Sequence, residues 1–119
     1  MNSYQEGLKD KMDTFVHFVY RVTKSFPREE LFGTVSQFRR AALSVILNYI
    51  EGYARRRQLV RLHFLEISYG SLQEAKYLLD FSEAEKYVDN TVSREGKVVA
   101  DEIGAMLWKE IGNLEGNKS

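Results

Sequence analysis

An arginine cluster is the residue pattern in this sequence that comes closest to carrying chemistry. Arg55, Arg56 and Arg57 are consecutive, and Arg61 follows four positions after them. Arginine presents a planar fork of N–H donors that suits phosphate, and a run of arginines raises the local positive potential. The cluster therefore predicts contact with the backbone of RNA or DNA. The alternative is a solvated, solubilising link, or one that pairs with acids of a neighbouring subunit.

The charge distribution leaves both interpretations of this cluster open. The chain has 17 basic and 17 acidic residues and a formal net charge of zero, whereas nucleic-acid-binding domains are usually basic overall. The charges are uneven, because residues 39–61 hold six arginines and one acid, Glu51, while residues 62–119 hold eleven acids and six bases. A balanced total therefore conceals a basic middle and an acidic C-terminal half.

A second group of polar residues recurs at helical spacing. Residues three or four positions apart lie along one face of a helix. One hypothesis is a groove that binds a ligand or a subunit. The favoured one is a polar network that fixes helix register, for example through an ion pair between an arginine and Glu74. The spaced residues are Gln37, Arg40, Ser44, Asn48 and Glu51 on one predicted helix and Ser71 and Glu74 on the next, and Arg39 is assigned to the same group.

Patterns typical of catalytic or metal sites are missing. The only histidines are His17 and His63, and the residues three positions before them are Thr14 and Val60, so the Glu-x-x-His pairs of di-iron bundles do not occur. The chain has no cysteine, no Gly-x-Ser-x-Gly elbow and no phosphate-binding loop. We predict no catalytic residues, no metal and no cofactor, and hence a protein that is not an enzyme.

Four amphipathic segments must position these residues. Apolar side chains at spacings of three and four predict a helix in each segment. Pro27 should end the first helix, Gly52 should stop the second, and Thr91 should cap the start of the fourth. The predicted helices cover about residues 4–25, 28–51, 58–81 and 91–114. Because short links make consecutive helices antiparallel neighbours, the predicted fold is all-α, an antiparallel up-down four-helix bundle.

Length and composition predict one domain, residues 1–115, followed by a short polar tail, residues 116–119, that we expect to be disordered. Hydrophobic residues make up 44% and charged residues 29%, as in globular proteins. No apolar run is long enough to span a membrane, and the N-terminus has no apolar signal segment. Together with the lack of cysteine, these features predict a cytoplasmic protein without a membrane partner.

Several short sequence blocks carry a family resemblance. They are Phe-Pro-x-Glu-Glu at residues 26–30, Ser-Gln-x-Arg-Arg-Ala at 36–41, Asn-x-x-Glu-Gly at 48–52 and Gly-Ser-Leu-Gln-Glu at 70–74. In this order and spacing, over about residues 15–114, the chain resembles the four-helix-bundle proteins encoded in intervening sequences of bacterial 23S rRNA genes. It is more distantly similar to the accessory variability determinant protein of diversity-generating retroelements.

The resemblance implies an antiparallel four-helix bundle assembled as a homopentamer, with no established catalytic activity. The more distant relative implies a pentameric bundle that works with a reverse transcriptase and nucleic acid. We therefore expect a ring-forming adaptor for RNA, DNA or a ribonucleoprotein, with a protein partner such as a reverse transcriptase. The alternative is a protein–protein scaffold with no nucleic-acid role. By this likeness, the family's characteristic polar positions are Ser36, Gln37, Arg39, Arg40, Asn48, Glu51, Ser71 and Glu74.

Overall fold

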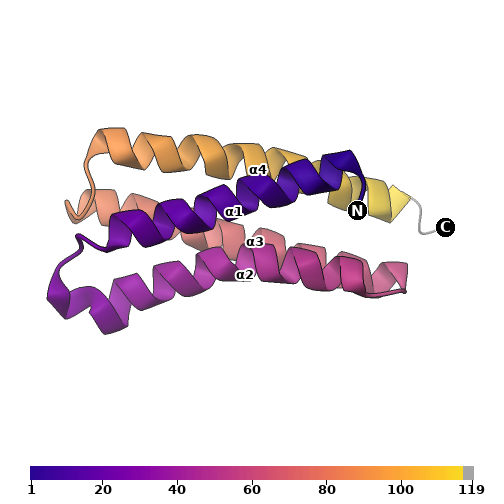
Figure 1. The fold of residues 1–119 in the computed structure, drawn as a ribbon, viewed down its shortest axis with the longest axis horizontal. Coiled ribbons are helices and arrows are strands. Elements are labelled where there is room, and N and C mark those ends of the chain that lie inside the picture. The colour runs from indigo at the N-terminus through magenta and orange to yellow at the C-terminus, as the bar shows by residue number, and fades with distance from the viewer. Residues whose placement is uncertain (117–119) are drawn as a thin grey trace.

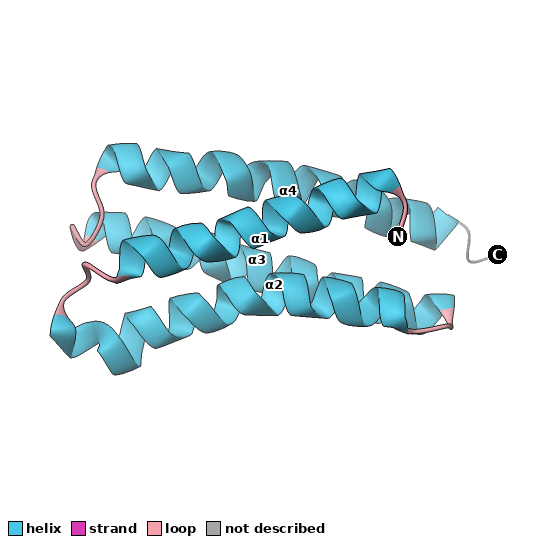
Figure 2. Ribbon diagram, viewed as in Figure 1, coloured by secondary structure: helices cyan, strands magenta, loops and turns pink. Residues whose placement is uncertain are grey.

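The computed structural model describes residues 1–116, which form four long helices packed side by side (Figures 1 and 2). Each helix contacts the next along the chain, and the first also contacts the last, so the four close into an elongated bundle of 49 × 25 × 19 Å. The part of the chain that the structure describes contains no strand. The predicted all-α four-helix bundle is confirmed. The helices are α1 (Ser3–Thr23), α2 (Ser36–Ala54), α3 (Gln58–Ala84) and α4 (Asn90–Gly116).

A capping box starts α1. The Asn2 side chain accepts a hydrogen bond from the backbone N–H of Gln5 at 2.9 Å, and the Gln5 side chain accepts one from the backbone N–H of Asn2 at 2.9 Å. This reciprocal pair satisfies two N–H groups that have no partner inside the helix. The helix ends at Thr23, slightly before the predicted end at Ser25.

The segment between α1 and α2 differs from the prediction. The prediction of a single helix beginning at Arg28 is wrong. The chain instead forms a 3₁₀ turn, η1 (Arg28–Glu30), and a π-helical turn, η2 (Leu31–Val35), before α2 begins at Ser36. Gly33 has non-helical backbone angles, φ −111° and ψ −109°, which interrupt regular α geometry. At its other end α2 continues past the predicted stop at Gly52 and ends at Ala54.

The apolar stripes of the four helices meet in one core, as their spacing predicts. Two glycines allow neighbouring helices to pack closely against each other. A Cβ at Gly96 of α4 would lie 2.5 Å from the ring of Phe18 in α1, and one at Gly52 would lie 2.7 Å from Leu65 in α3. The largest fully buried side chains are Leu8, Met12, Phe15, Val19, Phe38, Val45, Tyr49, Leu65, Leu72, Leu79, Ile103 and Leu107.

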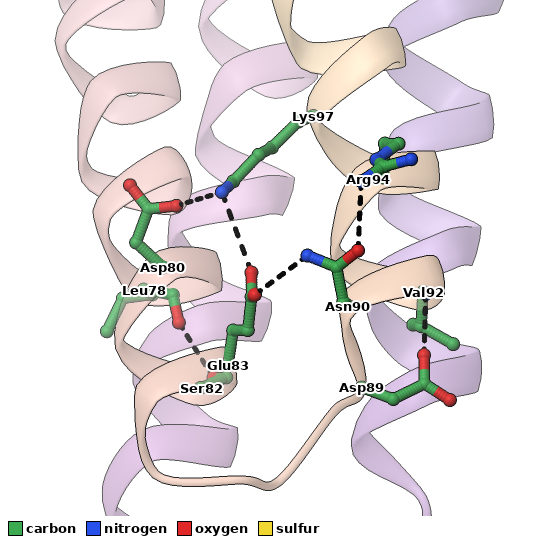
Figure 3. Close-up of polar contacts among 9 residues, drawn as sticks. All are labelled: Leu78, Asp80, Ser82, Glu83, Asp89, Asn90, Val92, Arg94 and Lys97. Carbon is green, nitrogen blue, oxygen red and sulfur yellow. Dashed lines mark hydrogen bonds and ion pairs between the residues drawn. The ribbon is translucent and has the colours of Figure 1, made fainter.

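The start of α4 corrects a second prediction. Asp89, not Thr91, provides the cap, because an Asp89 carboxylate oxygen accepts a hydrogen bond from the backbone N–H of Val92 at 2.8 Å (Figure 3). Thr91 lies inside the first turn and is exposed. The far end of α4 reaches Gly116, so this residue belongs to the helix rather than to the predicted tail, and residues 117–119 lie outside the described part of the chain.

Polar side chains close the turn between α3 and α4. Lys97 of α4 pairs with Asp80 at 2.7 Å and with Glu83 at 3.6 Å, and Asn90 donates a hydrogen bond to Glu83 at 3.1 Å (Figure 3). Lys86 adopts a left-handed backbone conformation, φ 66°, that lets the chain reverse direction. This end of the bundle is held by contacts within the chain.

Within residues 1–116, no helix combines the length and apolar character that crossing a membrane requires.

Candidate functional site

The arginine link, residues 55–57, joins α2 to α3 at the end of the bundle where α1 begins and α4 ends (Figure 1). Arg61, in the first turns of α3, holds this link in place. Its Nε donates a hydrogen bond to the carbonyl of Gly52 at 3.3 Å, and its Nη2 donates one to the carbonyl of Arg55 at 3.0 Å. Its guanidinium also lies 4.7 Å from the centre of the Tyr53 ring. Arg61 thus satisfies carbonyls at the C-terminal end of α2.

Arg55 is also engaged within the chain. Its guanidinium forms an ion pair with Glu51, one turn earlier on α2, and lies 5.2 Å from the centre of the Phe64 ring. Arginine over an aromatic face gains a cation–π attraction, and the pairing with Glu51 cancels its charge locally. Arg55 therefore helps to fix the link and contributes little free positive charge.

Arg56 and Arg57 are the two members of the cluster left uncommitted. Both are exposed, and within residues 1–116 neither side chain makes a hydrogen bond or an ion pair. Arg57 has extended backbone angles, φ −82° and ψ 131°, in a link of only three residues between two helices. The structure thus divides the predicted cluster into two arginines that hold the link and two that project their charge into solvent.

A polar groove lies between α2 and α3. Its volume is about 420 Å³, and it is lined by Gln37, Arg40, Ala41, Ser44, Ser71 and Glu74. The hydroxyls of Ser44 and Ser71 lie 2.7 Å apart and join the two helices at its floor. Asn48 supports this pair by donating hydrogen bonds to the Ser44 carbonyl at 2.8 Å and to its hydroxyl at 2.9 Å. Five residues of the predicted polar group therefore line one surface.

The remaining predicted polar residues lie elsewhere or act differently. Arg39 turns toward α1, where it donates a hydrogen bond to the Thr23 hydroxyl at 2.9 Å and lies 4.6 Å from the centre of the Tyr20 ring. Glu51 of α2 forms an ion pair with Arg55 of the arginine link. No ion pair or hydrogen bond reaches the side chains of Arg40 or Glu74 within the described residues, so the two helices are joined here by serine hydroxyls without a salt bridge to Glu74.

A buried carboxylate is the feature that the sequence interpretation missed. Glu110 of α4 is only 6% exposed, and the hydroxyls of Tyr49 and Tyr53 both donate hydrogen bonds to it, that of Tyr49 at 2.6 Å. Burial, followed by the hydrogen bond to Glu110, raises the pKa of both tyrosines above the usual value near 10. Two tyrosines four positions apart on α2, opposite an acid within the apolar stripe of α4, were the available signal.

The geometry of the cluster of Glu110, Tyr49 and Tyr53 indicates a structural role. Its tyrosines keep their protons at neutral pH, and each of the two carboxylate oxygens of Glu110 accepts a hydrogen bond from one of them. Within residues 1–116, no group of three or more His, Asp or Glu side chains is arranged to hold a metal ion. His17 is exposed beside Asp13, at 3.4 Å, and His63 is exposed next to Phe64.

Comparison with known proteins gives a fold relative and a family. The relative is the crystal structure of a protein with unknown function from the S23 ribosomal protein family of Bacteroides thetaiotaomicron VPI-5482. It superposes with a TM-score of 0.81 at 21% sequence identity, over 87% of this chain and 97% of that chain, which shows a shared fold. No curated protein matches the sequence significantly. The family described as 23S rRNA-intervening sequence protein matches residues 8–109. Because this match spans most of the sequence, the chain belongs to the 23S rRNA-intervening sequence protein family.

Proposed function

We propose that this protein is a non-enzymatic, ring-forming adaptor that contacts the phosphate backbone of RNA or DNA through Arg56 and Arg57. The observation that carries the proposal is that these two guanidinium groups are exposed and unpaired within residues 1–116, on a link that Arg55 and Arg61 hold in place. A guanidinium held on a short, anchored link loses less conformational entropy on meeting phosphate than one on a loose tail.

The family membership supports a nucleic-acid context. The family is named for intervening sequences of 23S rRNA, and the structural relative is assigned to a ribosomal protein family. Both names concern ribosomal RNA or its proteins, and the relative's function is unknown. These names favour a location near RNA or a ribonucleoprotein. A cytoplasmic location and a protein partner such as a reverse transcriptase are further parts of the proposal.

Self-assembly would strengthen a contact that is weak in one copy. Two arginines on a protein of zero net charge bind single-stranded nucleic acid poorly, because the acidic C-terminal half opposes long-range attraction. A homopentamer would repeat the Arg56–Arg57 pair around an axis, and the copies would act on one nucleic-acid chain together. The proposed assembly is therefore a ring that presents five arginine pairs.

The test is a titration of fluorescently labelled single-stranded RNA, followed by anisotropy at several salt concentrations. We expect binding that weakens steeply with salt and is lost in the double variant Arg56→Ala/Arg57→Ala. The matched control is Arg28→Ala/Arg94→Ala, which removes the same charge from exposed positions at the opposite end of the bundle. Equal loss in both variants would show that only overall charge matters and would contradict the proposed site.

A protein–protein scaffold without a nucleic-acid role is the second candidate function. Zero net charge favours it, and so do large apolar side chains on the surface, such as Leu47, 57% exposed, and Leu59, 62% exposed. The same titration separates the two candidates. If the wild-type protein does not bind RNA or single-stranded DNA even at low salt, the scaffold is the better proposal.

A further inference from the structure

A groove between α3 and α4 has walls suited to a flat, apolar group. Its volume is about 440 Å³, and the rings of Tyr69 and Trp108 pack together on its lining with their centres 5.2 Å apart. Trp108 is 64% exposed, which is unusual for the largest apolar side chain in the protein. A Cβ at Gly70 or Gly112 would meet no atom within 4 Å, so the groove beside the rings is open to a ligand.

The rim of this groove is negatively charged. Glu66 and Glu115 both line it, and within residues 1–116 neither carboxylate makes a hydrogen bond or an ion pair. The groove also lies over the last turns of α4, where the helix dipole adds partial negative charge. These charges repel phosphate, so they disfavour a nucleic-acid strand stacked on Trp108, and they attract a cation.

The best match to both features is a guanidinium group. Its flat face stacks on an aromatic ring, while the N–H groups along its edge remain free to donate hydrogen bonds to carboxylates. We propose that this groove binds an arginine side chain presented by a segment of a partner protein, with the guanidinium against Trp108 and its edge facing Glu66 and Glu115. This site shares no lining residue with the arginine link, although Gln58, which follows Arg57, donates a hydrogen bond at 2.8 Å to the carbonyl of Leu114, next to Glu115. Binding of a guanidinium there does not require nucleic acid.

The sequence provides a direct probe, because Trp108 is its single tryptophan. The experiment follows tryptophan fluorescence of the full chain during titration with a capped Arg-Gly-Arg peptide. The control peptide has citrulline in place of arginine, which keeps the shape and removes the charge. We expect a saturable fluorescence change with the arginine peptide, and binding at least about fivefold weaker with the citrulline peptide.

Two pairs of variants locate the site. Glu66→Gln/Glu115→Gln should weaken binding at least about fivefold, whereas Glu29→Gln/Glu85→Gln, which removes two exposed acids elsewhere, should leave it unchanged. Gly112→Leu should fill the groove and abolish binding. Gly7→Leu is its control, because a Cβ at Gly7 also meets no atom within 4 Å and lies in another helix.

Three results would overturn the proposal. One is equal binding of the arginine and citrulline peptides, and another is binding that survives Gly112→Leu. The third is a Trp108 signal that changes with protein concentration alone and disappears in Arg56→Ala/Arg57→Ala, because the occupant would then be the arginine link of a second copy. RNA binding through the arginine link can succeed or fail independently, since RNA titrations and peptide titrations report on different residues.

Discussion

Glu110 lies in the bundle core with two tyrosine hydroxyls as its hydrogen-bond donors. A buried carboxylate stabilises a fold only when such donors replace the water that it has lost. Tyr49, fully buried, and Tyr53 come from α2, whereas Glu110 comes from α4, two helices that are not neighbours along the chain. The cluster therefore holds α2 against α4 at the end of the bundle that carries the arginine link.

The first prediction concerns the Tyr49 hydroxyl. Tyr49→Phe should lower the free energy of unfolding by about 1.5–3 kcal/mol, because it removes a buried hydrogen bond to a charged group and keeps the ring. Urea unfolding followed by circular dichroism measures the change. The control is Tyr77→Phe, at a side chain 65% exposed, which should change stability by less than about 0.5 kcal/mol. Equal effects of the two substitutions would contradict the structural role of Glu110.

The second prediction concerns alkaline pH. Burial and Glu110 raise the pKa of Tyr49 and Tyr53, so the folded protein keeps these protons at pH values where the unfolded chain, with tyrosine pKa near 10, has lost them. Stability should be independent of these groups below pH 10 and should fall as the pH rises above it. Unfolding free energies at pH 8, 10 and 11 measure the decline.

Tyr49→Phe should make this alkaline decline shallower by about 1.4 kcal/mol per pH unit, the effect of one titrating group. Tyr4 and Tyr87, whose pKa values are also raised, titrate in both proteins and do not affect the difference. Parallel curves for the wild type and the variant would mean that Tyr49 ionises as easily in the folded protein as in the unfolded chain.

Among the elements, the link between α2 and α3 and the start of α3 contain two kinds of arginine. The side chains of Arg55 and Arg61 interact with other residues of the chain, whereas those of Arg56 and Arg57 are exposed and form no hydrogen bond or ion pair within residues 1–116. Arg61→Ala should lower the free energy of unfolding by about 1–2 kcal/mol, because it removes the hydrogen bond to the Arg55 carbonyl, one of the two hydrogen bonds to the Gly52 carbonyl, and the contact with the Tyr53 ring. Arg57→Ala should leave stability within about 0.5 kcal/mol of the wild type. Chemical denaturation of both variants makes the comparison, and a destabilised Arg57→Ala protein would contradict the division.

The approach of α1 to α4 depends on Gly96. A Cβ there would lie 2.5 Å from the ring of Phe18, which is only 2% exposed and cannot swing into solvent. Gly96→Ala should therefore cost about 1–2 kcal/mol, although alanine is the better helix former. Gly112→Ala, where a Cβ meets no atom within 4 Å, should be neutral or stabilising by up to about 1 kcal/mol. Thermal melts that rank the two variants in the opposite order would refute this account.

Elements defined by a local sequence pattern can be predicted from the sequence, whereas elements that depend on contacts between distant residues cannot. The apolar spacing of α1 and α3 is a local signal, and it predicts both helices closely. The turns η1 and η2 could not be predicted, because they follow from the backbone of Gly33 and from Glu30, whose side chain accepts hydrogen bonds from Thr34 and from distant Tyr87. The Asp89 cap could have been predicted from the sequence, since aspartate caps helices at least as readily as threonine.

The same distinction applies to the candidate site. Spacing alone brings Gln37, Arg40 and Ser44 to one face of α2, and the structure finds them in one groove. Spacing cannot tell that Arg39, one position away, turns to Tyr20 of α1, or that Arg55 and Arg61 are engaged by their neighbours. These outcomes depend on which residue of another helix lies opposite, and that information is tertiary.

Over the whole molecule, the arginine link and the acid-rimmed groove are formed by different residues. The exposed Arg56 and Arg57 belong to the α2–α3 link, while Glu66 and Glu115 rim the groove between α3 and α4. The link and the C-terminal part of α4 lie at the same end of the bundle (Figure 1). A protein of zero net charge can therefore present one surface suited to phosphate and another suited to guanidinium. In the proposed adaptor, the two surfaces would hold nucleic acid and a basic protein together.

The last prediction joins assembly to salt dependence. Light scattering of the purified protein should give a mass of about 69 kDa, five times the 13.8 kDa of one chain. Each phosphate contact on a single strand contributes about 0.7 to the slope of log binding constant against log salt, so the two free arginines of one copy give a slope no steeper than about −1.4. A ring that engages several copies must give a steeper slope. A mass of one chain together with a slope near −1.4 would contradict the ring and leave a monomer with a single weak phosphate contact.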